Sequence, residues 1–228
     1  MNDVSGFRRG GIARDMVETF AHLAISPDAS DAARLVNDLL DDGVPAEMVM
    51  LELLAPAARH MGEMWAGDEV TFLDVTLGMS RIQKLLRQVR CPAIGPAGDR
   101  GNALLLPVPG EQHVLGLRLV EEFLLRDGWS VRCTQAANSD HLRQLVAAET
   151  VDIVGFSLSG ERLLPDLRAA IRDVRAASRN RNVRIIVGGA IFAGQDCSSL
   201  HLDADAAAAN AFEAVAQANR LLAPAGVA

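Results

Sequence analysis

Residues 102–133 decide the fold class, and they read NALLLPVPGEQHVLGLRLVEEFLLRDGWSVRC. A short apolar run leads through a loop with proline and glycine into a long amphipathic stretch, and a second short apolar run follows. A strand, a helix and a strand in this order are typical of a parallel β-α-β unit. The loop after the first strand carries His113, with a carboxylate two residues before it and a glycine three residues after it. Such a histidine could be a metal ligand, a catalytic base or an ordinary surface residue.

The same alternation continues to the end of the chain. Further apolar runs read VDIVGFSLS, VRIIVGG and LDADAAA, and helical stretches such as LLPDLRAAIRDVRAA separate them. Apolar strands alternating with helices predict a five-stranded parallel sheet with helices on both faces, a flavodoxin-like (Rossmann-like) α/β fold. In such folds ligands bind at the carboxyl ends of the strands, near the point where the strand order reverses. The loop of His113 therefore lies where a ligand is expected.

The first part of the chain has helical periodicity instead. From about Asp15 to Arg90 apolar residues recur at helical spacing, which predicts a bundle of four helices. The stretch CPAIGPAGDRG then interrupts the pattern with prolines and glycines, as linkers do. We predict a helical bundle over residues 1–92, a linker over 93–102 and the α/β domain over 103–228.

Composition excludes several classes of protein. The chain has 228 residues, half of them hydrophobic, and a net charge of −7, which argues against direct binding to nucleic acid. It has neither the roughly 20-residue apolar run of a membrane span nor the apolar core of a signal peptide, so we expect a cytoplasmic protein that does not bind membranes. Cys91, Cys133 and Cys197 are widely spaced and odd in number, which favours neither disulfides nor a zinc site.

Three short motifs follow three of the predicted strands. They are EQHVLG at 111–116, SLS at 157–159 and the glycine pair at 188–189. In order and approximate spacing they resemble the signature of cobalamin-binding domains, DxHxxG, SxL and GG. The resemblance implies that the hydroxyl of Ser157 faces the cofactor, and that Ser159, which stands where the family usually has leucine, changes the wall of the pocket.

The resemblance implies a cobalt site at His113. In the base-off, His-on mode the cofactor's nucleotide tail leaves the cobalt, and the imidazole of His113 becomes the lower axial ligand. Glu111 would hold the other ring nitrogen, while Gly116, Gly188 and Gly189 would let the backbone approach the tail. Taken singly, each residue could instead be an ordinary turn or surface residue. The expected cofactor is an alkyl- or hydroxo-cobalamin, with haem, which a related domain senses, as the alternative.

The helical part resembles the cap that precedes cobalamin domains in methionine synthase, corrinoid methyl carriers and light-sensing regulators. Trp65 falls at the tryptophan of the regulators' WxxxxxxxxxEH motif, so the resemblance implies that Trp65 covers the corrin ring. Its possible neighbours there are Met64, Phe72 and Met79, although such residues also form ordinary bundle cores. Val75 and Thr76 stand where the regulators have Glu and His. The upper ligand is left open among His22, His60, water and none.

The stretch FLDVTLGMSRIQKLLR, residues 72–87, is similar to the PpaA/AerR antirepressors of photosynthesis genes, and so is GFSLSGERLLPDLRAAIRDVR. This resemblance implies a light- or ligand-responsive antirepressor, a monomer or weak dimer that binds a DNA-binding repressor of the PpsR/CrtJ type. A substrate domain does not fit in 228 residues, so we expect no enzyme activity from the chain by itself. The alternatives are a corrinoid methyl carrier, a haem-sensing variant, and an apo-domain that serves in protein interaction.

Overall fold

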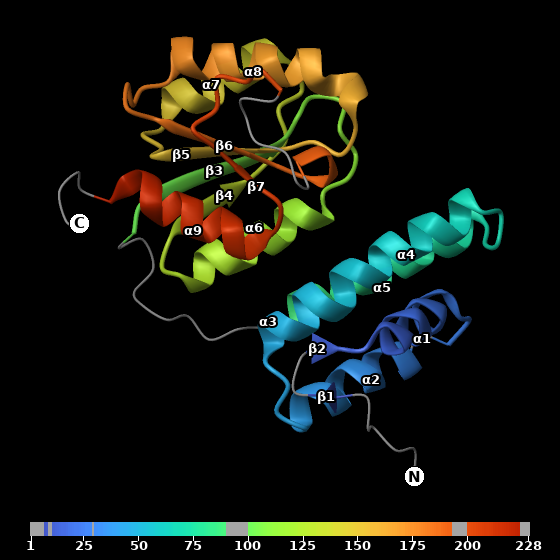
Figure 1. Cartoon of the computed structure of the whole chain (residues 1–228). Coiled ribbons are helices and arrows are strands. Elements are labelled where there is room, and N and C mark those ends of the chain that lie inside the picture. Colours follow the sequence, from blue (N-terminus) through green and yellow to red (C-terminus); the bar gives the residue numbers. More distant parts are fainter. Residues whose placement is uncertain (1–6, 9–10, 29, 90–99, 193–199, 224–228) are drawn as a thin grey trace. The chain divides into compact units, whose positions relative to one another are not determined.

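The alternating pattern of the second half folds into a layered α/β unit in the computed structural model, which describes residues 7–8, 11–28, 30–89, 100–192 and 200–223. Within these residues, parallel strands form one five-stranded sheet in the order β4-β3-β5-β6-β7 (Figure 1). The strands are β3 (Asn102–Pro107), β4 (Ser130–Cys133), β5 (Ile153–Ser157), β6 (Arg184–Gly188) and β7 (Ala206–Ala208). The predicted five-stranded parallel sheet is confirmed.

Helices cover both faces of this sheet (Figure 1). On one face lie α7 (Ser139–Ala148) and α8 (Leu164–Ala177), and on the other lie α6 (Leu115–Arg126) and α9 (Ala211–Leu222). Side chains of β3 alternate between the two apolar cores, Leu104 and Leu106 in one, Ala103 and Leu105 in the other. Because both faces are buried, the strands read as continuous apolar runs.

The strand order reverses at β3, whose carboxyl end defines the place for a ligand. From β3 the chain passes to β4 on one side of it and then to β5 on the other. Pro107, the last residue of β3, pairs with Ser157, which in turn pairs with Gly188. The loops that carry the motifs at 111–116, 157–159 and 188–189 therefore leave the same edge of the sheet.

The first 91 residues form a separate unit, Met1–Cys91. Its helices within the described residues are α1 (Arg14–Ile25), α2 (Ser30–Asp41), α5 (Phe72–Gln88), and a continuous run of α3 (Ala46–Met48), the π-helix η1 (Val49–Leu54) and α4 (Ala55–Ala66). A short hairpin of β1 (Phe7–Arg8) and β2 (Gly11–Ile12) precedes them. The second unit is Pro92–Ala228, and most of the predicted linker 93–102 lies outside the described residues. No described helix is long and apolar enough to cross a membrane.

Several residues of the stretch 72–87, which lies in α5, have structural roles. Thr71 and Asp74 form a capping box, in which the Asp74 carboxylate accepts from the Thr71 backbone N–H at 2.9 Å. A Cβ added to Gly78 would lie 2.5 Å from the sulfur of Met61, so a larger residue at position 78 would require the Met61 side chain to move. The Arg81 guanidinium donates to the carbonyl oxygen of Ala24 at 2.8 Å, in the last turn of α1. Much of the resemblance in this stretch therefore lies in residues that build the bundle.

Candidate cofactor-binding site

The candidate site begins with a tight turn after β3. The backbone N–H of Glu111 donates to the carbonyl oxygen of Val108 at 2.8 Å, and Gly110 adopts a φ of +90°, which favours glycine. The turn directs the carboxylate of Glu111 inward and the ring of His113 outward. The side chain of Glu111 is 5% exposed, whereas that of His113 is 80% exposed.

Glu111 fixes the tautomer of His113. The Oε1 atom of Glu111 lies 2.6 Å from Nδ1 of the ring and also accepts from the backbone N–H of His113 at 2.8 Å. An ionised carboxylate can only accept, so Nδ1 carries the proton and the lone pair of Nε2 faces outward. Within the described residues no hydrogen bond engages Nε2. His113 thus presents a free imidazole nitrogen to solvent, as an axial metal ligand must.

The carboxylate of Glu111 is held in its charged form. Burial acts to raise the pKa of Glu111, but hydrogen bonds from the backbone of His113 and of Ser159, from the imidazole ring and from the next residue along the chain outweigh it. The pKa of Glu111 therefore lies below its ordinary value. A charged carboxylate beside Nδ1 orients the ring and keeps Nε2 free to bind a metal.

Ser157 is a second residue whose surroundings indicate a bound ligand. It ends β5 in the centre of the sheet edge, between Pro107 of β3 and Gly188 of β6. Its hydroxyl oxygen is buried, and within the described residues it has no hydrogen-bond partner. A buried polar group without a partner is costly and uncommon in folded proteins. A polar atom of a bound molecule would satisfy this hydroxyl.

The three predicted glycines divide into two kinds. Gly189 has a φ of +115°, and a Cβ there would lie 2.2 Å from the carbonyl oxygen of Leu158. A Cβ on Gly188 would lie 3.1 Å from the carbonyl oxygen of Ala208. The fold alone therefore accounts for this pair. Gly116 is different, because an added Cβ would meet no atom within 4 Å. Open space at an exposed glycine beside His113 is what a site for a large cofactor requires.

We expect Gly116→Ala to separate stability from binding. The substitution adds a good helix former in the first turn of α6 and meets no clash, so the free energy of unfolding should stay the same or rise by up to ~1 kcal/mol. Cobalamin binding should weaken by at least about tenfold, because the methyl group occupies the space left for the cofactor. Thermal unfolding and a spectroscopic titration check the two halves. Unchanged affinity would mean that Gly116 has no part in the site.

Ser159 contributes in a way that the sequence did not predict. We expected its side chain to alter the pocket wall, but its backbone N–H donates to Oε2 of Glu111 at 2.7 Å. The structure thus brings together Glu111, His113 and Ser159, with Ser157 two residues before the last of them. A backbone contact of this kind depends on the path of the loop, and the residue type at position 159 does not indicate it.

Trp65 belongs to the helical unit. Its side chain is 50% exposed and packs edge-to-face on Phe72, with ring centroids 6.0 Å apart. Leu73 and Leu77 of α5 are also exposed, whereas Met64 is buried in the bundle core. Of the neighbours predicted for Trp65, Phe72 therefore contacts it.

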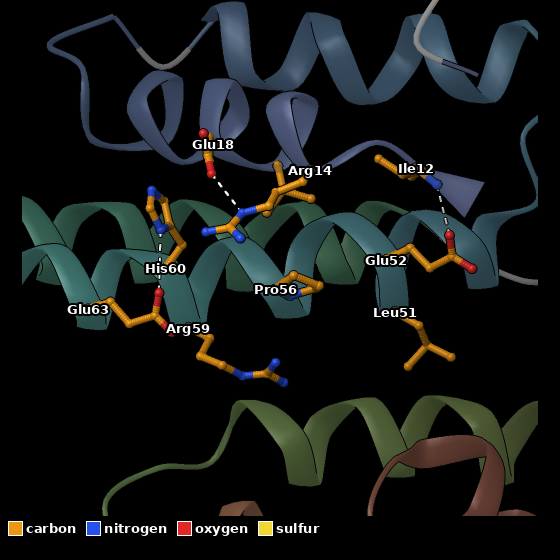
Figure 2. A pocket seen from close by; sticks show the side chains of 10 residues that line it. Ile12, Arg14, Glu18, Leu51, Glu52, Pro56, Arg59, His60 and Glu63 are labelled. Atoms are coloured by element: carbon orange, nitrogen blue, oxygen red, sulfur yellow. Dashed lines mark hydrogen bonds and ion pairs between the residues drawn. The ribbon is translucent and has the colours of Figure 1, made fainter. Parts of the chain in front are cut away.

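The two histidines considered as upper ligands lie in different surroundings. His22 is exposed in the last turn of α1. His60 lies in an open groove of about 520 Å³ on the helical unit, where its Nδ1 is 3.6 Å from a carboxylate oxygen of Glu63 (Figure 2). The groove is lined by Ile12, Arg14, Val17, Glu18, Leu51, Glu52, Pro56, Arg59, His60 and Glu63. Within the described residues no group of three or more His, Cys, Asp or Glu side chains is placed to hold a metal ion.

Comparison with protein families gives matches for both units. A family model described as the B12 binding domain matches residues 101–216, and a second model of the same description matches residues 16–90. Together they cover the unit with the His113 site and the helical bundle.

Among curated proteins, the chain is 31% identical over 152 residues to the uncharacterized 20.5 kDa protein in the bchF-crtJ intergenic region of Rhodobacter capsulatus. This alignment covers 65% of the chain and 78% of that protein. Monomethylamine corrinoid protein 1 of Methanosarcina mazei is 23% identical over 88% of the chain and 94% of its own length. The structure of the Methanosarcina barkeri monomethylamine corrinoid protein superimposes with a TM-score of 0.73 at 17% identity, over 92% of the chain and 99% of that protein. This last likeness concerns the fold.

Proposed function

Because this chain belongs to the B12-binding domain family, we propose that it is a cobalamin-binding antirepressor, whose cofactor state controls its affinity for a DNA-binding repressor of photosynthesis genes. The single observation that carries the regulatory part is the relative in the bchF-crtJ intergenic region. The cobalamin part stands on the family and on the donor set of the site.

The residues present fit a cobalamin. The exposed Nε2 of His113 would bind the cobalt, because a neutral imidazole is a good ligand for this metal. The bound group supplies a cobalt centre whose upper ligand can be exchanged or photolysed. Glu111 keeps the imidazole in the coordinating tautomer, Ser157 offers its unpartnered hydroxyl, and Gly116 leaves room beside them. A haem would use the same nitrogen, but both matching family models describe B12 binding.

Two lines of support favour a regulator. The Rhodobacter capsulatus relative is named for a position beside crtJ, and the sequence resemblance implies a repressor of the PpsR/CrtJ type. The net charge of −7 is suited to a partner with a basic DNA-binding surface and disfavours contact with DNA itself. On this proposal the chain catalyses no reaction alone and acts through protein contact as a monomer or weak dimer.

A corrinoid methyl carrier is the second candidate. It is favoured by the likeness to the monomethylamine corrinoid proteins, which spans 94% of the Methanosarcina mazei protein. A carrier would have the same cofactor and the same lower ligand, but its partner would be a methyltransferase. The two candidates therefore differ in the partner and not in the site.

The choice is tested by measuring repressor binding in three cofactor states. The signal that a sensor passes to its partner is limited by how much its affinity for that partner differs between the cofactor states. We expect the illuminated, cobalamin-loaded protein to bind a PpsR/CrtJ-type repressor at least about tenfold more tightly than the apo or dark alkylated protein, and to weaken the repressor's hold on DNA. Gel-shift titrations with all three states measure this difference. Equal binding in all three, together with methyl transfer to an added methyltransferase, would favour the carrier.

We expect Trp65→Ala to change the behaviour of bound cobalamin more than the stability of the fold. Because half of the indole is exposed, its removal should cost less than the ~3–5 kcal/mol typical of a buried aromatic side chain. Photolysis rates of an alkylcobalamin should change, while affinity for hydroxocobalamin should fall little. As a matched control, Phe212→Ala removes a similarly exposed ring from α9. Equal photolysis in the wild type and Trp65→Ala would exclude Trp65 from the upper face.

A further inference from the structure

A cluster of three charged side chains lies at the amino-terminal ends of β6 and β7, opposite the edge that carries the candidate site. Asp205 directly precedes β7, and Arg184 is the first residue of β6. Arg175 comes from the last turn of α8. The guanidinium of Arg175 donates to Oδ2 of Asp205 at 2.6 Å, and that of Arg184 donates to Oδ1 at 3.0 Å. The cluster therefore joins β6, β7 and α8.

The backbone around Asp205 strengthens this junction. Oδ2 of Asp205 accepts from the backbone N–H of Ile185 at 2.7 Å, and the backbone N–H of Asp205 donates to the carbonyl oxygen of Ile185 at 2.8 Å. The Arg175 guanidinium also donates to the carbonyl oxygens of Val183 at 2.6 Å and of Asp203 at 3.3 Å. The start of β7 is thus bound to the start of β6 and to the end of α8.

The carboxylate of Asp205 is held in its charged form. Burial acts to raise the pKa of Asp205, but hydrogen bonds from the Ile185 backbone and from the two guanidinium groups outweigh it, so the pKa lies below its ordinary value. Three donors thus converge on two oxygen atoms, in a side chain that is 13% exposed. An asparagine has one acceptor oxygen, so in either orientation its amide nitrogen would face a donor.

The strand that follows Asp205 has little else to hold it. β7 has three residues, Ala206–Ala208, and among the described strands β6 is its one neighbour. Alanine side chains bury little apolar surface, so packing contributes less to the position of β7 than it does for the longer, larger-chained strands of the centre. The bonds to Asp205 therefore carry much of the work of fixing this strand.

The other end of β7 borders the candidate site. Ala208, its last residue, pairs with Gly188, which pairs with Ser157. The carbonyl oxygen of Ala208 would lie 3.1 Å from a Cβ added to Gly188. The carbonyl oxygen of Gly188 accepts from the backbone N–H of Leu158 at 2.9 Å, directly after the unpartnered hydroxyl of Ser157. A displacement of Ala208 would therefore disturb the residues beside that hydroxyl.

We propose that Asp205 is a positioning residue for cofactor binding, which fixes the start of β7 and thereby keeps Ala208 against Gly188 at the edge of the candidate site. The inference rests on the proposed cobalamin binding. A strand rises about 3.3 Å per residue, so the carboxylate acts over roughly 10 Å. Asp205 itself touches no cofactor, and its effect passes along the three residues of β7.

The first test uses the cofactor-free protein. NMR spectra and amide hydrogen exchange are compared in wild type, Asp205→Asn and the control Asp203→Asn, whose carboxylate is 81% exposed and lies 3.9 Å from the same Arg175. In Asp205→Asn we expect the Ile185 amide to exchange at least tenfold faster and the amide resonance of Ala208 to shift. Asp203→Asn should change neither. An unshifted Ala208 resonance in Asp205→Asn would overturn the proposal.

The second test measures the affinity for hydroxocobalamin. Asp205→Asn should bind at least about tenfold more weakly than wild type, whereas Asp203→Asn should bind equally well. Val146→Ala controls for a general loss of stability, because Val146 is buried in α7 and its truncation leaves a cavity outside the charged cluster. It should unfold at a lower denaturant concentration and keep the wild-type affinity. Equal losses of affinity in Asp205→Asn and Val146→Ala would overturn the positioning role.

Arg184→Met keeps the test decisive if Asp205→Asn does not fold. It removes one of the two cations and its hydrogen bond, so the resonance of Ala208 and the affinity should change in the same direction by smaller amounts. Wild-type values of both would overturn the proposal. If wild type binds no cobalamin, the proposed function fails together with the role in binding, whereas the Ala208 resonance in the cofactor-free variants still decides whether Asp205 positions β7.

Discussion

Replacing His113 by alanine is expected to abolish the base-off, His-on absorbance spectrum and to weaken cobalamin binding by more than about 100-fold. Loss of a residue that only supports a metal ligand typically costs about 10- to 100-fold in affinity, and His113 is the proposed ligand itself. The fold should be untouched, because the ring is 80% exposed and its only hydrogen bonds are those to Glu111 among the described contacts. Spectroscopic titration with hydroxocobalamin measures both effects.

His141→Ala is the matched control for this substitution. His141 lies in the first turn of α7, where its ring accepts from the backbone N–H of Ala137 at 3.2 Å, and it belongs to none of the three motifs. Its removal should leave both the spectrum and the affinity unchanged. If His113→Ala bound cobalamin with the wild-type spectrum, the assignment of His113 as axial ligand would be wrong.

Replacing Gly189 by alanine is expected to lower the free energy of unfolding by about 2–5 kcal/mol. The φ of +115° is one that residues with a Cβ rarely adopt, and the added methyl group would lie 2.2 Å from the carbonyl oxygen of Leu158. The backbone would have to move in the loop after β5, which begins at Leu158, follows Ser157 directly and includes Ser159. We therefore expect cobalamin binding to weaken as well. Denaturant unfolding of the cofactor-free protein measures the loss of stability.

Gly160→Ala provides the comparison for Gly189→Ala. Gly160 has an extended backbone, with φ of −139°, and an added Cβ would meet no atom within 4 Å. Its stability should change by less than about 1 kcal/mol. Similar stabilities for the two variants would show that the loop relaxes around the new methyl group, and the fold would then not explain the glycine at 189.

The sheet was predictable because its strands are buried on both faces. Runs such as ALLLP and IVGFS have few polar residues, since α6 and α9 cover one side and α7 and α8 cover the other. The helical unit was predictable from periodicity, although nothing in the periodicity indicated that residues 49–54 form a π-helix. The fold class also indicated that the loop of His113 lies near the point where the strand order reverses, whereas the order itself, β4-β3-β5-β6-β7, comes from the structure.

The site was predictable to the level of residue types. The spacing of Glu111 and His113 indicated a carboxylate beside an imidazole, and the structure places Oε1 2.6 Å from Nδ1. The contact from the Ser159 backbone was not predictable, because every residue type except proline carries the same N–H. The different roles of Gly116 and Gly189 were also not predictable from the sequence, because they depend on which atoms surround each α-carbon.

Electron paramagnetic resonance of the protein loaded with cob(II)alamin tests the central claim most directly. The unpaired electron of cobalt(II) couples to the nucleus of the axial nitrogen, which splits the signal into triplets for ¹⁴N and doublets for ¹⁵N. We predict that protein labelled with ¹⁵N only in its histidines, and loaded with unlabelled cofactor, gives doublets that disappear in His113→Ala. Triplets in the labelled wild-type protein would mean that the cofactor keeps its own base on cobalt, and would contradict ligation by His113.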